Sequence, residues 1–360
     1  MSQKKQSLAY IISASSVGTL IEWYDFYIFG SLATVLSTKF FPTDNPTAAF
    51  LNTLATFAAG FVVRPFGALV FGRLGDLIGR KYTFMVTLML MGGATFAIGL
   101  VPSYATIGGW APFLVLTLRL LQGLALGGEY GGAATYVAEH SPAERRGFFT
   151  SWIQTTATVG LVISLGVIML TRSSMSKEAF DEYGWRIPFI ASSLLVVVGF
   201  YIRTKITETP SFESAKKEKE EVKVPFLTLI KSYRNQLIFG TLSAVTTFLV
   251  FYLMTVFTLS WATSDLGIVK RDGLLIQLFS VLFFALFIPV SAVVADKIGR
   301  RKMLIIATAA IALFGFLFSS FLSKGNIILI TTFACTGMAL MGFTYGPLGT
   351  FLSELFPTNV

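Results

Sequence analysis

Long apolar stretches separated by short polar segments dominate this chain. A helix that crosses a bilayer needs about 20 consecutive, predominantly apolar residues. About ten stretches meet this requirement, and several contain glycine pairs and other small residues that let helices pack closely. The pattern therefore predicts an all-α integral membrane protein. The expected spans are residues 10–36, 48–72, 82–101, 111–138, 150–170, 186–203, 236–262, 274–295, 303–322 and 327–353.

The composition fits lipid rather than water as the surrounding solvent. Of the 360 residues, 54% are hydrophobic and 13% are charged, whereas soluble domains average about 25% charged residues. The net charge is +9, but the basic residues lie in short clusters between the apolar stretches and form no single basic domain. This distribution argues against a nucleic-acid partner and for the lipid bilayer.

The basic clusters also predict an orientation. Most of the 28 Lys and Arg residues fall in alternate connecting segments, which the positive-inside rule assigns to the cytoplasm together with the N-terminus. The one long polar segment, residues 204–235, mixes both signs of charge, so we expect a cytoplasmic linker there. The predicted domains are an N-terminal six-helix bundle over residues 1–203 and an incomplete four-helix bundle over residues 236–360 of a plasma-membrane protein.

Two short patterns occur once in each half of the chain. Residues 75–81 (GDLIGRK) resemble residues 295–301 (ADKIGRR), and residues 136–142 (YVAEHSP) resemble residues 351–357 (FLSELFP). Each pattern falls at the cytoplasmic end of the corresponding span, and duplicated helical bundles are a transporter architecture. The first half continues for two more spans after its second pattern, so we expect about ten helices of a full set of twelve.

The segment between the second and third spans, residues 72–81 (GRLGDLIGRK), carries the most specific pattern. Its glycines permit a tight turn, and Asp76 and Arg80 are suited to bind helix ends or opposite charges. A plain basic loop with turn glycines is the alternative, but the recurrence in the second half favours a defined motif. The decapeptide resembles the loop signature of the major facilitator superfamily.

Three further segments resemble the metabolite:proton symporter family within that superfamily. They are residues 18–27 (GTLIEWYDFY), residues 119–132 (RLLQG running into GGEYGG) and residues 208–212 (ETPSF). That family includes transporters of proline and betaine, α-ketoglutarate, citrate and shikimate. The resemblance implies two pseudo-symmetric helical bundles that work by alternating access, with a conformational latch. The latch residues would be Gly72, Gly75, Asp76, Gly79, Arg80, Asp296, Gly299 and Arg300.

The sequence departs from the wider superfamily in two places. Ala292 and Ala295 replace two of the motif glycines in the second half. The fifth span, around Gly160 and Gly166, lacks the Gly-Pro signature of proton antiporters. The second departure favours symport over antiport.

Charged residues inside the expected spans need an explanation, because each costs about 2.5–3.5 kcal/mol on insertion scales. Glu22 and Asp25 are three residues apart and share one helical face. In the fourth span Arg119 falls on the same side of the helix as Glu129. Carboxyl groups in this setting are candidates to take up a proton. The proton-coupling candidates are Glu22, Asp25, Glu129 and Arg119, the last because a matching arginine serves proton coupling in related facilitators.

A substrate carboxylate could be held by bidentate contacts from an intramembrane arginine. The alternative is that the acids and arginines pair with each other and only hold the helices together. Polar and aromatic neighbours complete the set of candidates. The substrate-binding candidates are Arg64, Arg119, Gln122, Tyr27, Tyr130 and Gln154.

No pattern of an enzyme, a metal site or a cofactor site survives inspection. The chain has one histidine, His140, and one cysteine, Cys335. Residues 67–73 approach a phosphate-binding loop, but Arg73 stands where lysine is required. We therefore expect a monomeric secondary transporter with a small-molecule substrate and a proton as partners, and no cofactor. The alternative is a truncated, non-transporting member or a membrane sensor or scaffold on the same fold.

Overall fold

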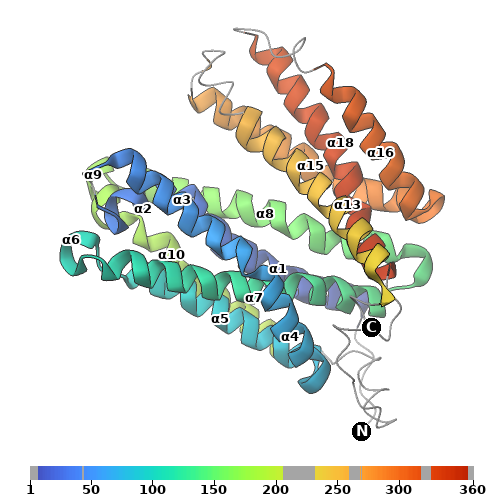
Figure 1. The fold of residues 1–360 in the computed structure, drawn as a ribbon, viewed down its shortest axis with the longest axis horizontal. Coiled ribbons are helices and arrows are strands. Elements are labelled where there is room, and N and C mark those ends of the chain that lie inside the picture. Colours follow the sequence, from blue (N-terminus) through green and yellow to red (C-terminus); the bar gives the residue numbers. More distant parts are fainter. Residues whose placement is uncertain are drawn as a thin grey trace. The chain divides into compact units, whose positions relative to one another are not determined.

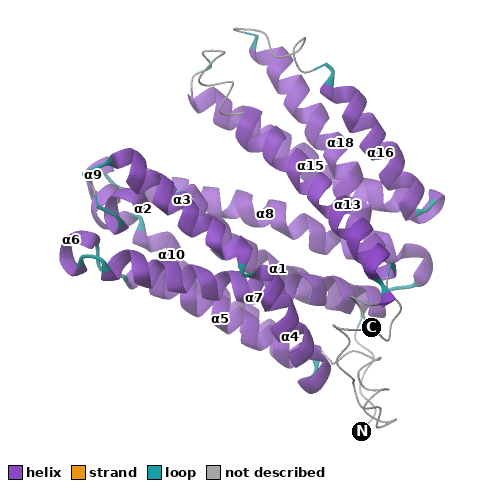
Figure 2. Cartoon of the chain, viewed as in Figure 1, coloured by secondary structure: helices purple, strands orange, loops and turns teal. Residues whose placement is uncertain are grey.

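The computed structural model describes residues 7–42, 44–205, 232–258, 268, 270–317 and 326–355. Every regular element within these ranges is a helix, as Figure 2 shows. The predicted all-α class is thereby confirmed for this part of the chain. Most of the predicted linker at 204–235, and all of the 208–212 segment, lie outside the described residues.

Eight helices among the described residues are long and apolar enough to cross a membrane. Two of the ten expected spans fall outside this set for different reasons. Helix α1 (Leu8–Ser31) has 24 residues but carries Glu22 and Asp25, and α16 (Arg300–Gly315) is described over 16 residues. The eight candidate spans are Pro46–Gly75, Arg80–Leu100, Trp110–His140, Ala143–Ser173, Arg186–Lys205, Arg234–Thr255, Leu275–Ile298 and Ile327–Glu354.

The chain divides into two compact units (Figure 1). The first unit consists of Met1–His140 and Val159–Val222, and the second of Ser141–Thr158 and Lys223–Val360. Residues 141–158, which the sequence placed in the first bundle, thus pack with the second unit. They do so because the start of α8 (Arg146–Ser173) contacts α15 (Lys270–Ile298) and α18 (Ile327–Glu354) through polar side chains.

The remaining elements of the first unit are helices with short connections. They are α2 (Ala33–Phe40), α3 (Pro46–Val62), α4 (Arg64–Ile78), α5 (Arg80–Leu100), α6 (Tyr104–Ile107), α7 (Trp110–His140), α9 (Lys177–Ala179), η2 (Phe180–Gly184) and α10 (Arg186–Lys205). The short segment α9 and the π-helical turn η2 precede α10, the last helix of this unit. The second unit adds η1 (Ala143–Arg145), α13 (Arg234–Tyr252) and the π-helical turn η3 (Leu253–Phe257).

Glycines of α7 bring this helix into backbone contact with α3 and α4 in the first unit. A Cβ atom added at Gly123 would overlap the carbonyl group of Gly60, and one at Gly127 would overlap that of Arg64. The helix is interrupted at Val63, between α3 and α4. Pro65, two residues later, has no backbone N–H to donate. The break and the close contact together place Arg64 beside α7.

The second unit uses the same device between α15 and α18, which lie side by side in Figure 1. A Cβ atom added at Gly346 would overlap the carbonyl group of Ile288, and the hydroxyl of Ser291 donates to the Gly342 carbonyl at 2.9 Å. Close contact of this kind is typical of small residues at membrane helix interfaces. Spans at corresponding positions in the two halves are therefore joined in the same way.

The turn of the repeated motif has the same backbone in both units. Gly79 precedes α5 with φ = 100°, and Gly299 precedes α16 with φ = 97°. Residues with a side chain rarely adopt this left-handed region, so glycine is required at both places. The recurrence of the motif in the sequence thus corresponds to a recurring turn.

Candidate functional site

Buried charges are concentrated in the first unit. Glu22 and Asp25 on α1, and Arg119 and Glu129 on α7, are each at most 1% exposed. Arg64 at the start of α4 is half-buried. All five therefore lie in the protein interior or its margin, where an uncompensated charge is costly.

A sixth buried charge, Arg203, was not among the predicted site residues, because it stands at the very end of the expected span 186–203. It lies in the last turn of α10 and is 1% exposed. Its guanidinium forms an ion pair with Glu129 and donates to the carbonyl of Phe84. The signal that could have found it is the spacing Ser192, Val196, Gly199 and Arg203, because these residues continue one buried helical face.

Glu129 has a full set of partners. Arg203 binds it through both terminal nitrogens, with Nη1 at 3.3 Å from Oε2 and Nη2 against Oε1. The hydroxyl of Thr87 on α5 donates to the same Oε2 at 2.7 Å. Glu129 therefore pairs with an arginine of α10, and not with Arg119 of its own helix.

Arg119 is held by neutral groups. Its Nη1 donates to Gln122 Oε1 at 2.6 Å and its Nη2 to the Phe57 carbonyl at 3.4 Å. Gln122 in turn donates from Nε2 to Thr95 at 2.7 Å. Within the described part of the chain Arg119 forms no ion pair, and its Nε has no hydrogen-bond partner. The guanidinium is thus a buried cation whose hydrogen bonds go to neutral oxygens.

Aromatic rings surround both arginines of this region. The Cζ atom of Arg119 lies 4.4 Å from the ring centroid of Phe26, and that of Arg64 lies at the same distance from the same ring. Trp23 also contacts Arg64, at 5.4 Å, and Tyr27 stacks on Trp23. Contacts of a cation with a ring face stabilise it by about 0.5–2 kcal/mol. The structure therefore brings Arg64, Arg119 and Tyr27 together around Phe26.

The carboxyl group of Asp25 is completely buried, and neither of its oxygens has a hydrogen-bond partner among the described residues. The hydroxyls of Thr95 and Ser192 are the polar groups that lie near it. Thr95 donates its own proton to the carbonyl of Met91 at 2.9 Å, so it has none left for Asp25. A neutral carboxylic acid is tolerated in such a place far better than a carboxylate.

The remaining substrate-binding candidates do not join this group. Gln154 belongs to the second unit, where its Nε2 donates to the Tyr345 carbonyl at 3.0 Å. Its Oε1 is buried and has no hydrogen-bond partner in the described ranges. The side chains of Tyr130 and of the motif residue Asp76 lie outside the described part of the structure.

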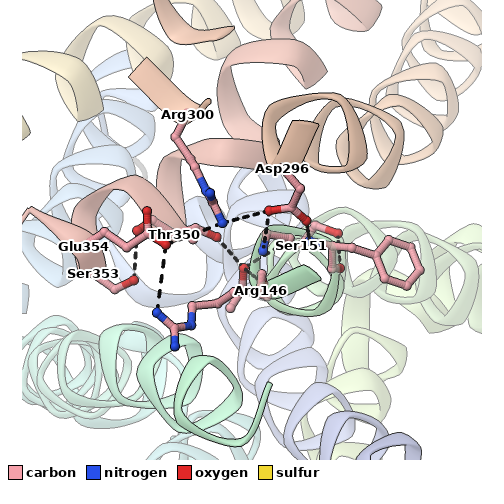
Figure 3. A network of polar contacts seen from close by, with 10 residues as sticks. Arg146, Ser151, Asp296, Arg300, Thr350, Ser353 and Glu354 are labelled. Atoms are coloured by element: carbon pink, nitrogen blue, oxygen red, sulfur yellow. Dashed lines mark hydrogen bonds and ion pairs between the residues drawn. The ribbon is translucent and has the colours of Figure 1, made fainter. Parts of the chain in front are cut away.

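The repeated motif forms a polar cluster in the second unit, shown in Figure 3. Asp296 accepts hydrogen bonds from the backbone N–H groups of Gly147 at 3.0 Å and Phe148 at 2.9 Å, at the start of α8. Nη2 of Arg300 forms ion pairs with Asp296 Oδ1 at 2.8 Å and with Glu354 Oε1 at 3.5 Å. Asp296 thereby satisfies the free N–H groups at a helix N-terminus and complements its dipole.

The first unit repeats part of this arrangement. Arg80 forms an ion pair with Glu139 at 3.6 Å, as Arg300 does with Glu354. These four residues align in the two sequence repeats. Gly75 is buried and Gly72 is exposed with open space around it. The contribution of Glu139 and Glu354 to the motif was not among the predicted site residues, although both lie in the second repeated pattern.

Comparison with known families supports what the repeated turn and ion pair indicate. The sequence profile described as "Major Facilitator Superfamily" matches residues 7–360. The chain belongs to the Major Facilitator Superfamily. Its relatives and solved structural neighbours are transporters rather than enzymes.

Several curated relatives of this facilitator cover nearly all of the chain. The inner membrane metabolite transport protein YhjE of Escherichia coli is 42% identical over 97% of this chain and 81% of its own length. The proline/betaine transporter of Salmonella typhimurium is 35% identical over 97% of this chain and 72% of its own length. The shikimate transporter of E. coli is 36% identical over 89% of this chain and 74% of its own length.

Solved structures show the same fold. The proton:xylose symporter XylE superposes with a TM-score of 0.77 over 97% of this chain and 82% of its own, at 19% identity. Its partially occluded inward-open form gives a TM-score of 0.72. The facilitator is accordingly a multi-pass helical membrane protein of a transporter family, with a small molecule as its substrate.

Proposed function

We propose that this facilitator is a proton-coupled symporter of a small organic acid or zwitterionic metabolite that works by alternating access. It would act as a monomer in the plasma membrane, with its N-terminus in the cytoplasm. The observation that carries the proposal is Arg119, a buried guanidinium that forms no ion pair among the described residues. A substrate carboxylate is the anion that would complete this site.

The surroundings of Arg119 suit a carboxylate. Gln122 fixes one side of the guanidinium and leaves Nε without a partner in the described structure. Arg64 places a second positive charge on the same phenylalanine ring. Relatives are named for the transport of proline, betaine and shikimate, and each of these solutes carries one carboxylate. This shared group supports a monocarboxylate or zwitterion as the substrate class.

Asp25 is the proton carrier that the geometry favours most. Its carboxyl group is buried and has no hydrogen-bond partner or ion pair in the described residues. Burial of the protonated, neutral carboxyl group therefore costs little free energy. The ionised form is stable only when water or a cation contacts the carboxylate. Opening of the site to one side of the membrane would supply that water, which links proton release to the conformational change.

The motif residues are proposed to act as a conformational latch. The ion pairs Arg80–Glu139 and Arg300–Glu354 and the cap from Asp296 to α8 each join ends of different helices. Such contacts are lost when the helix ends separate and form again when they return. The latch set remains Gly72, Gly75, Asp76, Gly79, Arg80, Asp296, Gly299 and Arg300.

Uptake into proteoliposomes tests the proposal. An inward proton gradient is imposed, and accumulation of radiolabelled proline, betaine and shikimate is measured with and without a protonophore. We expect gradient-driven accumulation of one of these classes, its loss in Arg119→Gln, and loss of gradient dependence in Asp25→Asn. Arg172→Gln is the matched control because Arg172 is exposed. Accumulation that persists after the gradient is collapsed would contradict proton coupling.

A further inference from the structure

Glu22, Glu129 and Arg203 form a second charged group in the first unit, separate from the Arg119 site. They come from α1, α7 and α10, and each side chain is at most 2% exposed. We propose that this triad, named here the shared-charge triad, binds one proton on Glu22, and that Arg203 is the positioning residue that fixes the proton there. The inference rests on the proposed proton-coupled transport and adds a second proton site to it.

The charge balance of the triad requires one proton. Two carboxylates and one guanidinium carry a net charge of −1, and an uncompensated charge in the interior costs several kcal/mol. The polar groups that α5 contributes are neutral: the Phe84 carbonyl and the Thr87 hydroxyl. The other charged group that acts on Glu22 is Asp25 of the same helix, and it is an acid. A single proton therefore makes the triad neutral.

The contacts assign that proton to Glu22. Glu129 uses both oxygens, against Arg203 and against Thr87. Glu22 lies 3.9 Å from Nη1 of Arg203, and neither of its oxygens has a hydrogen-bond partner in the described part of the chain. A buried carboxyl group that accepts no hydrogen bond is more stable when it carries its own hydrogen, which it can then donate to Glu129.

Gly18 provides independent support for a built site. It lies one turn before Glu22 on α1, and the guanidinium of Arg203 occupies the space where a side chain would begin. A Cβ atom added at Gly18 would lie 2.6 Å from Nε and 2.7 Å from Cζ of Arg203. The glycine thus admits Arg203 between α1 and α7, and an alanine there would displace it without changing any charge.

The triad links the proton to helix packing. While Glu22 holds the proton, Glu129 is the carboxylate that Arg203 binds, and this contact joins α10 to α7. When the proton leaves, two carboxylates compete for one guanidinium, and the attachment of α10 to α7 weakens. Protonation of Glu22 would therefore favour the packed arrangement seen here.

Infrared spectroscopy of the purified full-length protein in lipid nanodiscs counts protonated carboxyl groups by their C=O stretch. We expect Glu22→Gln to remove one protonated carboxyl per protein. Glu129→Gln should also remove one, because Arg203 then pairs with an ionised Glu22. Arg203→Gln should add one, since both acids must then be neutral, whereas Arg203→Lys should leave the count unchanged.

Gly18→Ala should reproduce the gain of Arg203→Gln, at least in part, while Gly93→Ala serves as the matched control because nothing lies within 4 Å of its added Cβ. An unchanged count in Glu22→Gln would overturn the proposal, and so would an unchanged count in a folded Arg203→Gln protein. If Arg203→Gln does not fold, the numbers of protonated carboxyl groups in Glu22→Gln and Glu129→Gln test the proposal.

The infrared result is separable from the transport result. Asp25→Asn should remove its own protonated carboxyl and leave the responses of Glu22, Glu129 and Arg203 intact. Transport that does not depend on the gradient would refute the proposed symport. The numbers of protonated carboxyl groups expected for the triad variants would still hold. Gradient-driven transport with an unchanged count in Glu22→Gln would refute only the triad.

Discussion

At the scale of single residues, the intramembrane charges separate into two kinds. Glu129 and Arg203 satisfy each other, whereas Arg119 and Asp25 have no opposite charge among the described residues. A buried ion pair needs no ligand, but an isolated buried charge has a cost that a ligand or a proton can remove. Arg119 and Asp25 are therefore better candidates for binding than Glu129 is.

The geometry of Arg119 predicts that lysine cannot replace it. Arg119→Lys keeps the positive charge but loses the planar fork that Gln122 and Phe57 hold and that a carboxylate would meet. We expect the KM for the substrate to rise at least tenfold, which corresponds to about 1.4 kcal/mol. Uptake kinetics in proteoliposomes measure the change, and an unaltered KM would place the substrate carboxylate elsewhere.

The sequence located most of these residues but not their partners. Glu22, Asp25, Arg119 and Glu129 stand out because they are charges within apolar stretches. Arg203 lies where such a stretch ends, and its ion pair with Glu129 of α7 is seen only in the packed structure. Pairing between side chains on different helices depends on packing, which spacing along one helix does not determine.

At the scale of helices, glycines decide how closely spans approach. Gly123 and Gly127 on α7 meet backbone carbonyl groups of α3 and α4, while Gly131 on the same helix has open space around it. The same device joins α18 to α15 in the second unit, through Gly342 and Gly346. The sequence could not show which glycine faces a backbone and which faces nothing.

This difference gives a stability prediction. Gly123→Ala forces α7 away from α3, and overpacking of this kind costs about 1–3 kcal/mol. We expect a clearly lower thermal unfolding temperature in detergent for Gly123→Ala. Gly131→Ala is the control within the same helix and should unfold at the temperature of the unaltered protein. Equal effects of the two substitutions would mean that helix propensity, and not close contact, sets the outcome.

The cap on α8 gives a second prediction at this scale. Asp296→Ala removes two hydrogen bonds to backbone N–H groups and the charge that Arg300 contacts. Loss of such a cap costs about 0.5–2 kcal/mol. We expect faster backbone hydrogen exchange at the start of α8, measured by mass spectrometry. The comparison is Asp272→Ala, because Asp272 is a half-buried acid in the first turn of α15. Equal exchange at the start of α8 in both variants would contradict a stabilising cap from Asp296.

At the scale of the whole molecule, the family sets the architecture and the charge distribution predicts its orientation. Basic residues gather in alternate connections, which favours a cytoplasmic N-terminus. A reporter fused to the N-terminus should be active only on the cytoplasmic side. A periplasmic signal would reverse the side assigned to the motif turns at Gly79 and Gly299.

The whole fold was the part most readily predicted. Apolar stretches indicate spans regardless of how they pack, because lipid excludes unpaired backbone groups. The repeated patterns at 75–81 and 295–301 indicated the duplicated design, and the turns at Gly79 and Gly299 have the same backbone. The assignment of residues 141–158 to the second unit was not foreseen, since it depends on side chains of α15 and α18 that contact the start of α8.

The central claim is that a proton gradient drives uptake of a carboxylate-bearing solute through Arg119 and Asp25. The most direct measurement is solute accumulation by proteoliposomes under an imposed inward proton gradient, with the protein unaltered and with Asp25→Asn. The account predicts accumulation above the external concentration in the first case and only equilibration in the second. Equal accumulation in both, or accumulation that a protonophore does not abolish, would contradict it.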